Sequence, residues 1–114
     1  MKEKNDLVFI EHILESIKAI KEFSKGITQN ELENNRLKQS AIVREIEIIG
    51  EAVKNISDSF KNNHKEIEWK DIAGTRDKMI HHYFGVDLEI IFGIIKNDIP
   101  DLEEKLIKIK KSFE

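Results

Sequence analysis

A long apolar stripe in the middle of the chain constrains its fold more than any other feature. Between residues 42 and 60, apolar side chains recur at alternating steps of four and three residues, which places them on one side of an α-helix. The stripe consists of Ile42, Ile46, Ile49, Val53, Ile56 and Phe60. It must be buried against partner helices, so the sequence predicts a long helix inside a helical bundle.

The segment before this stripe predicts another helix. Residues 6–23 carry apolar side chains at helical spacing, and we expect Asp6 to be the N-cap of this helix and Gly26 to follow its end. Thr28 and Glu31 have the spacing of a capping box, which predicts the start of the long helix. Within that helix, Gly50 indicates either the close approach of another backbone or a bend.

The second half of the chain is less regular. Residues 61–68 lack an apolar period and predict the one substantial loop. Trp69 opens a short segment that reaches Tyr83, and Asp87 is expected to cap the following helix. Pro100 marks either a kink or the first turn of a last helix.

The fold class follows from these segments and from what the chain lacks. It has 114 residues, one proline and five glycines, and no strand-like alternation of polar and apolar residues. We therefore expect one domain over residues 1–114, with an all-α fold: an up-and-down four-helix bundle with an extra short helix.

Composition also limits the function. The absence of cysteine excludes disulfides, thiolate nucleophiles and cysteine-ligated metals. No segment approaches the ~18 apolar residues of a membrane span, and no signal peptide is evident, so we expect a soluble, cytoplasmic protein without membrane contact. The net charge of −3 means that any nucleic acid must bind a local basic patch or a partner.

One short segment concentrates groups that could perform chemistry. It contains Arg76, Asp77, Lys78, His81, His82 and Tyr83. On a straight helix Tyr83 lies ~20° from the line of Arg76, but His81 lies ~140° away. Arg76 and His81 can therefore converge only if the helix ends near His81 or a second copy of the chain completes the site, which predicts a homodimer.

These side chains fit the cleavage of RNA without a metal or other cofactor. The 2′-hydroxyl of RNA is a nucleophile next to the phosphate, so one general base and one cation suffice. We expect His81 to be the base, Arg76 to bind the phosphate and Asp77 to orient the imidazole of His81. Lys78, His82 and Tyr83 would line the pocket.

The segment resembles a known family. Arg76, His81 and Tyr83 match the Arg-x4-His-x-Tyr signature of HepT toxins in the HEPN superfamily. The resemblance extends to residues 48–52 and 69–74 and to the order of helices. HepT-like proteins are small helical bundles that dimerise around the motif.

The resemblance implies a function. It suggests the toxin of a type VII toxin–antitoxin system, a metal-independent ribonuclease with Arg76 and His81 as catalytic residues. Tyr83 would be the residue to which an MntA-like nucleotidyltransferase antitoxin transfers AMP. A bulky, anionic adduct beside Arg76 would block the cleft and compete for its charge. The alternative is an inactive helical module that docks a nucleotidyltransferase or a nucleotide.

Simpler explanations exist for most of these residues. Arg76 could pair with Asp71 or Glu68 on the surface, and His81 and His82 could cap a helix C-terminus. A metal site that combines these histidines with His64 is not expected, because adjacent histidines point to different faces.

Other side chains have structural interpretations. Trp69 is expected to anchor the motif segment in the core. The lysines at positions 105, 108, 110 and 111 are expected to form a solvated face with nearby acids. Glu51 falls in the apolar region of the long helix and is expected to need a partner, Arg44 or Arg76.

Overall fold

The computed structural model describes residues 2–79 and 87–114, and all regular elements in this part of the chain are helical. The elements are α1 (Lys2–Phe23), α2 (Gln29–Asn34), α3 (Arg36–Asn55), α4 (Asp58–Asn63), α5 (Trp69–Ala73), α6 (Thr75–Met79), α7 (Leu88–Gly93), the π-helical turn η1 (Ile94–Asp98) and α8 (Ile99–Ser112). The predicted all-α class is confirmed. No described helix has the length and hydropathy needed to cross a bilayer.

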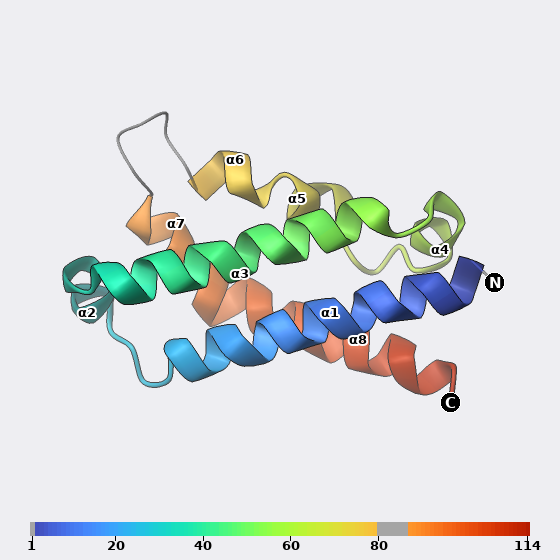
Figure 1. Cartoon of the computed structure of the whole chain (residues 1–114), viewed down its shortest axis with the longest axis horizontal. Helices are drawn as coiled ribbons and strands as arrows, with labels where there is room; N and C mark the ends of the chain where they lie inside the picture. Colours follow the sequence, from blue (N-terminus) through green and yellow to red (C-terminus); the bar gives the residue numbers. More distant parts are fainter. Residues whose placement is uncertain (1, 80–86) are drawn as a thin grey trace.

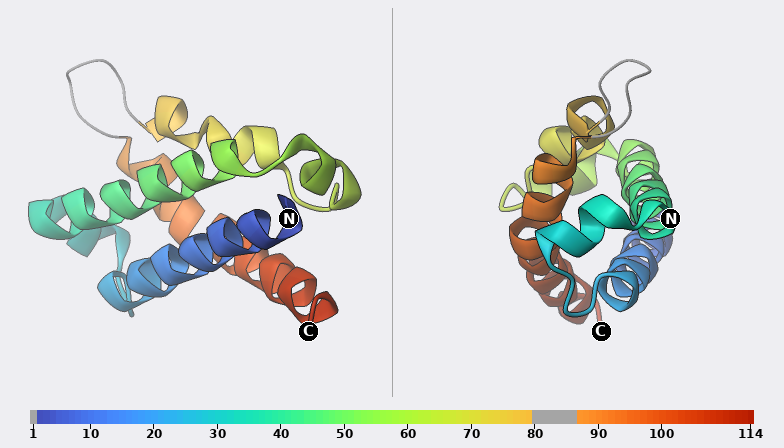
Figure 2. Two further views of the ribbon diagram at one scale, coloured as in Figure 1. Left: turned by 45° about the vertical axis from the view of Figure 1, so that its right-hand side comes forward. Right: turned by 90° about the vertical axis from the view of Figure 1, so that its left-hand side faces the viewer.

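The helices form an up-and-down bundle. α1 and α3 lie side by side and run in opposite directions, and α5 and α6 lie along the other side of α3 (Figure 1). The unit formed by α7, η1 and α8 completes the bundle. Its helix α7 contacts both α2 and α6, whereas α8 contacts α1. Figure 2 shows these units around a common interior. Among the described residues, α5 and α6 are therefore supported mainly by α3.

The core is built largely from isoleucine. Its members from the long helices include Ile10, Ile13, Ile17 and Ile20 of α1, Ile42, Ile46, Ile49 and Val53 of α3, and Leu102, Leu106 and Ile109 of α8. Burial of each such side chain contributes roughly 1.5–3 kcal/mol. The predicted stripe is thus buried, but α3 ends at Asn55 with Ile56 in an extended conformation. Phe60 reaches the core from α4 instead.

Asp6 has a different role from the one predicted. α1 already begins at Lys2, so Asp6 is not its N-cap. Asp6 is buried, and its carboxylate accepts hydrogen bonds from the backbone N–H and the hydroxyl of Ser57, at 2.8 and 2.7 Å. Ser57 is the N-cap of α4. A buried carboxylate requires donors, and here they tie the start of α4 to α1.

The start of the long helix also differs from the prediction. Thr28 caps a helix as expected, with Oγ1 accepting from the N–H of Glu31 at 3.1 Å. However, this helix is only α2, and Asn35 begins α3 by accepting from the N–H of Lys38 at 3.0 Å. Asparagine side chains compete with helical backbone hydrogen bonds, which explains why the helix is interrupted at Asn35, between α2 and α3.

The predicted loop at residues 61–68 is partly wrong. α4 continues to Asn63, and only the remainder is non-helical. The prediction failed because a six-residue helix that buries only Phe60 has no apolar period for the sequence to reveal.

In the last helical unit, the predicted N-cap is confirmed and the position of Pro100 is one of the two that the sequence allowed. Asp87 caps α7 by accepting from the N–H of Ile90 at 3.1 Å, as predicted. Pro100 lies in the first turn of α8, which was one of the two alternatives, but η1 joins α7 to α8 directly. In η1 the N–H of Ile99 bonds to the carbonyl of Ile94, five residues earlier. Proline lacks an N–H and clashes with the carbonyl four residues earlier in a regular α-helix, which explains why a wider turn precedes Pro100.

Gly50 allows two backbones to approach each other. A Cβ atom at this position would lie 3.5 Å from the carbonyl oxygens of both Ile72 and Ala73. The first of the two explanations predicted for Gly50 is therefore correct. The contact sets the distance between α3 and the segment that carries Arg76.

Candidate functional site

The described structure includes the first half of the predicted site. Arg76, Asp77 and Lys78 are exposed on α6. His81, His82 and Tyr83 lie outside the described residues, so their predicted roles stay predictions.

Buried side chains lie at both ends of residues 69–79, the part of the motif segment that the structure describes. Trp69 is buried at the start of α5, where its indole N–H donates to the carbonyl of His64 at 3.0 Å and its ring meets Phe60 edge-on. Met79 is fully buried at the end of α6. The prediction that Trp69 is a core anchor is confirmed. Arg76 lies between these two anchors.

Arg76 makes an ion pair with α3. Its Nε donates to Oε2 of Glu47 at 2.8 Å, and the Arg76 and Glu47 side chains are 57% and 28% exposed. The surface pairing considered from the sequence, with Asp71 or Glu68, is therefore not the arrangement adopted. The carboxylate comes from a helix 29 residues away in the chain.

The close approach at Gly50 and the ion pair of Arg76 with Glu47 follow from one antiparallel alignment of α3 with the segment that contains α5 and α6. Gly50 contacts Ala73, whereas Glu47, three residues earlier on α3, contacts Arg76, three residues later on the motif segment. This is the pattern of two segments that run in opposite directions. The sequence analysis did not identify Glu47, although its spacing of three from Gly50 places both on one side of α3.

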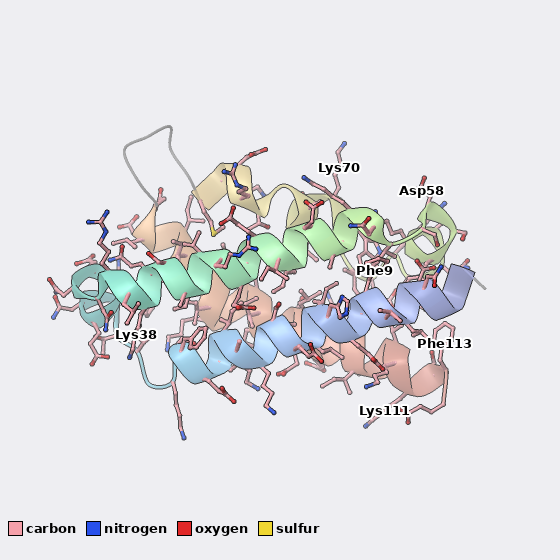
Figure 3. All side chains as sticks on the ribbon, in the orientation of Figure 1. Phe9, Lys38, Asp58, Lys70, Lys111 and Phe113 are labelled. Atoms are coloured by element: carbon pink, nitrogen blue, oxygen red, sulfur yellow. The ribbon has the colours of Figure 1, made fainter. Side chains whose placement is uncertain are left out.

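A cavity of about 750 Å³ opens beside this ion pair. Residues of α1, α3, α5 and α6 line it, and one of them is Phe9 of α1, which is labelled in Figure 3. Its cationic residues are Arg44, Lys54 and Arg76, its carboxylates are Glu15, Glu45, Glu47 and Glu51, and His12 also contributes. The volume suits a small ligand or part of a polymer.

Glu51 does not behave as predicted. It is exposed, and within residues 2–79 and 87–114 its carboxylate makes no ion pair with Arg44 or Arg76. The expectation assumed burial, but this face of α3 opens into the cavity. A solvated carboxylate needs no partner.

Lys78 lies on a different side of the motif segment from Arg76. It lines a second cavity, of about 500 Å³, together with Glu68, Asp71 and apolar residues of α3, α7 and α8. The pKa of Glu68 is raised, first because its protonated carboxyl donates a hydrogen bond to the Asp71 carboxylate and then because the negative charge of Asp71 disfavours the ionised form. Arg76 and Lys78 therefore do not meet in one pocket of this chain.

The predicted basic face of the last helix is confirmed as a salt-bridged surface. Lys105 pairs with Asp101 at 2.9 Å, Lys108 with Glu104 at 3.5 Å and Lys110 with Glu11 at 3.7 Å. In the described part of the chain, no three histidine or carboxylate side chains are placed to hold a metal ion.

Comparison with known proteins agrees with the family that the sequence resembles. Residues 13–109 match the family model described as ribonuclease HepT-like. The chain belongs to the HepT-like ribonuclease family.

Several relatives have names that fit this family. "Probable ribonuclease HepT" of Thermococcus cleftensis is 44% identical over 90% of this chain and 94% of its own length. "Putative RNase TTE0752" of Caldanaerobacter subterraneus is 44% identical over 89% of this chain and 90% of its own length.

A longer relative carries a second activity in its name. "Gamma-glutamylcyclotransferase and putative RNase MJ0434" of Methanocaldococcus jannaschii is 40% identical over 97% of this chain. This chain spans only half the length of that protein. No solved structure matches the chain.

Proposed function

We propose that this HepT-like protein is an RNA endonuclease in which Arg76 binds the scissile phosphate and His81 moves the proton. The observation that carries the proposal is the position of Arg76, whose side chain is held at the edge of a 750 Å³ cavity. Members of the family are named as ribonucleases, which supports RNA as the substrate. Asp77 would orient His81, and His82 and Lys78 would assist.

The chemistry requires no metal. The RNA 2′-hydroxyl attacks the adjacent phosphorus, His81 accepts the hydroxyl proton and the P–O5′ bond breaks, which leaves a 2′,3′-cyclic phosphate. The 5′-oxygen that leaves is protonated by His82 or water. Arg76 balances the charge that develops on the phosphate oxygens.

The complete site is proposed to form in a homodimer. His81 is five residues after Arg76, and a straight helix separates the two side chains by ~140°. A second copy of the chain can supply the missing group across a symmetric interface. Light scattering should therefore give a dimer under the conditions in which RNA is cleaved.

We also propose that the protein is the toxin of a type VII toxin–antitoxin pair in the cytoplasm. An MntA-like nucleotidyltransferase would transfer AMP from ATP to the Tyr83 hydroxyl and release pyrophosphate. The match of Tyr83 to the HepT motif supports this assignment, and the new phosphodiester would add a negative charge that competes for Arg76. Intact mass after incubation with ATP, magnesium and the transferase should increase by one or more adenylates, and Tyr83→Phe should abolish the increase.

The direct test is RNA cleavage in EDTA. Wild-type protein should cut RNA, and Arg76→Ala and His81→Ala should each lower the rate by about 10²–10⁴-fold. Lys108→Ala, which removes an exposed cation on α8, is the control and should leave the rate unchanged. Full activity of either site variant would refute the catalytic assignment.

A second candidate is an inactive module that docks a nucleotidyltransferase. The four carboxylates around the cavity, against three cations, favour it, because they oppose a polyanion. A purified dimer that never cuts RNA but binds the transferase tightly would support this module over the enzyme.

A further inference from the structure

The ion pair between Arg76 and Glu47 suggests an additional role in the proposed reaction. We propose that Glu47 is a positioning residue, which holds the Arg76 guanidinium by Nε so that its terminal nitrogens can bind an RNA phosphate. This inference rests on the proposed ribonuclease function.

The hydrogen-bond geometry supports separate roles for Nε and for the terminal nitrogens of Arg76. A guanidinium has five N–H groups, one on Nε and four on the two terminal nitrogens. Glu47 accepts from Nε at 2.8 Å. This bond occupies the side of the guanidinium nearest its own backbone, and the terminal nitrogens are the pair that bind a phosphate bidentately.

The two partners differ in how firmly they are held. Glu47 projects from the middle of the 20-residue helix α3, next to the buried Ile46, and its side chain is 28% exposed. Arg76 is 57% exposed on a helix of only five residues. A long exposed arginine samples many rotamers, so its direction must come from the more firmly held partner.

The register at Gly50 fixes the distance between the partners. The backbone of Ala73 lies against Gly50, one turn from both members of the ion pair. Separation of α3 and α5 is therefore set by backbone contact one turn before Arg76, and Glu47 has only to set the direction of the Arg76 side chain.

A second ion pair in the same protein provides a matched control. Lys21 of α1 and Glu103 of α8 are joined at 2.9 Å, with side chains 57% and 25% exposed. Its length, exposure and link between two helices match those of the Arg76–Glu47 pair, but Lys21 and Glu103 line neither large cavity. Glu103→Ala therefore reports the effect of losing such a pair on folding alone.

The experiment compares single-turnover RNA cleavage by wild type, Glu47→Ala, Glu47→Gln and Glu103→Ala. Glu47→Ala should lower the rate about 10- to 100-fold, as expected for a misplaced reacting group. Glu47→Gln, whose amide oxygen can still accept from Nε, should recover much of that loss. Glu103→Ala should cleave like wild type and melt at the same temperature as Glu47→Ala within a few degrees.

Binding separates positioning from a merely structural effect. The probe is a 2′-O-methyl oligonucleotide, which lacks the nucleophile, and its affinity is measured by fluorescence anisotropy. Glu47→Ala should weaken binding in the wild-type protein but not in an Arg76→Ala background, because the two residues act through one contact.

The outcomes distinguish this inference from the proposed function. If Arg76→Ala is inactive but Glu47→Ala cleaves within twofold of wild type, the positioning role is wrong and the ribonuclease assignment stands. Faster cleavage or tighter binding by Glu47→Ala would mean that the carboxylate competes with RNA, which also overturns positioning. Full activity of Arg76→Ala would overturn both.

Discussion

Side-chain size at position 50 should control both stability and activity. In Gly50→Ala, the new Cβ would lie 3.5 Å from the carbonyl oxygens of Ile72 and Ala73, which is ordinary van der Waals contact. Alanine also has a helix propensity about 1 kcal/mol better than glycine. We therefore expect Gly50→Ala to be about 0.5–1 kcal/mol more stable than wild type.

Gly50→Leu should have the opposite effect. Three further carbon atoms would have to fit where two backbone oxygens already touch the Cβ position, and neither oxygen can move without displacing α5. Overpacking of this kind costs about 1–3 kcal/mol. Because Arg76 and Glu47 lie one turn from this contact, displacement of α5 should also separate them and slow RNA cleavage.

The assay is urea unfolding at 25 °C together with single-turnover RNA cleavage. Gly93 supplies the control, because a Cβ atom there would meet nothing within 4 Å. Gly93→Ala and Gly93→Leu should both be as stable as wild type or up to about 1 kcal/mol more stable, and should differ little from each other, whereas the two substitutions at Gly50 should differ by about 1.5–4 kcal/mol. If Gly50→Leu is as stable and active as Gly50→Ala, the close approach does not control the site.

Three further substitutions test other contacts. Asp6→Ala removes two hydrogen bonds to Ser57 and should cost about 2–4 kcal/mol in urea unfolding; a loss below 0.5 kcal/mol would contradict the role of this carboxylate. Trp69→Phe removes one indole N–H bond and should cost about 1–2 kcal/mol; unchanged stability would show that the bond is dispensable. Asp71 raises the pKa of Glu68 above 4.5 in the folded protein, so protonated Glu68 stabilises the folded state. This contribution to the free energy of unfolding is fully present below pH 4.5 and is lost as the pH rises through the raised pKa. Asp71→Asn should bring the pKa of Glu68 back toward 4.5 in an NMR titration, and no change would exclude Asp71 as the cause.

Features that depend on local periodicity were predictable from the sequence. The stripe from Ile42 to Val53 predicted both the helix α3 and its buried face. Thr28 was correctly predicted to be an N-cap, although the helix that it caps is the short α2 and not the long helix. Trp69 could be predicted as a core anchor, and its burial excludes the alternative of an exposed platform on which a base could stack. In each case the information lies within one or two turns of the chain.

Features that depend on distant partners were not predictable. Asp6 obtains its donors from Ser57, 51 residues later, and Glu47 meets Arg76 across 29 residues. Spacing along one helix carries no information about such contacts, so Asp6 was read as a local cap and Glu47 was overlooked. The first half of the motif was located correctly on a short helix, and the roles of His81 and Tyr83 stay predictions.

The π-helical turn between α7 and α8 affects how the length of this chain can vary. The turn closes its hydrogen bond over five residues instead of four, so it holds one more residue than an α-helical turn. Loss of one residue at the exposed Asn97, combined with replacement of Pro100, would leave a regular helix with the buried faces of α7 and α8 still aligned. The same loss within α8 would rotate Leu106 by ~100° out of the core. Single-residue insertions and deletions among relatives should therefore concentrate at residues 94–98.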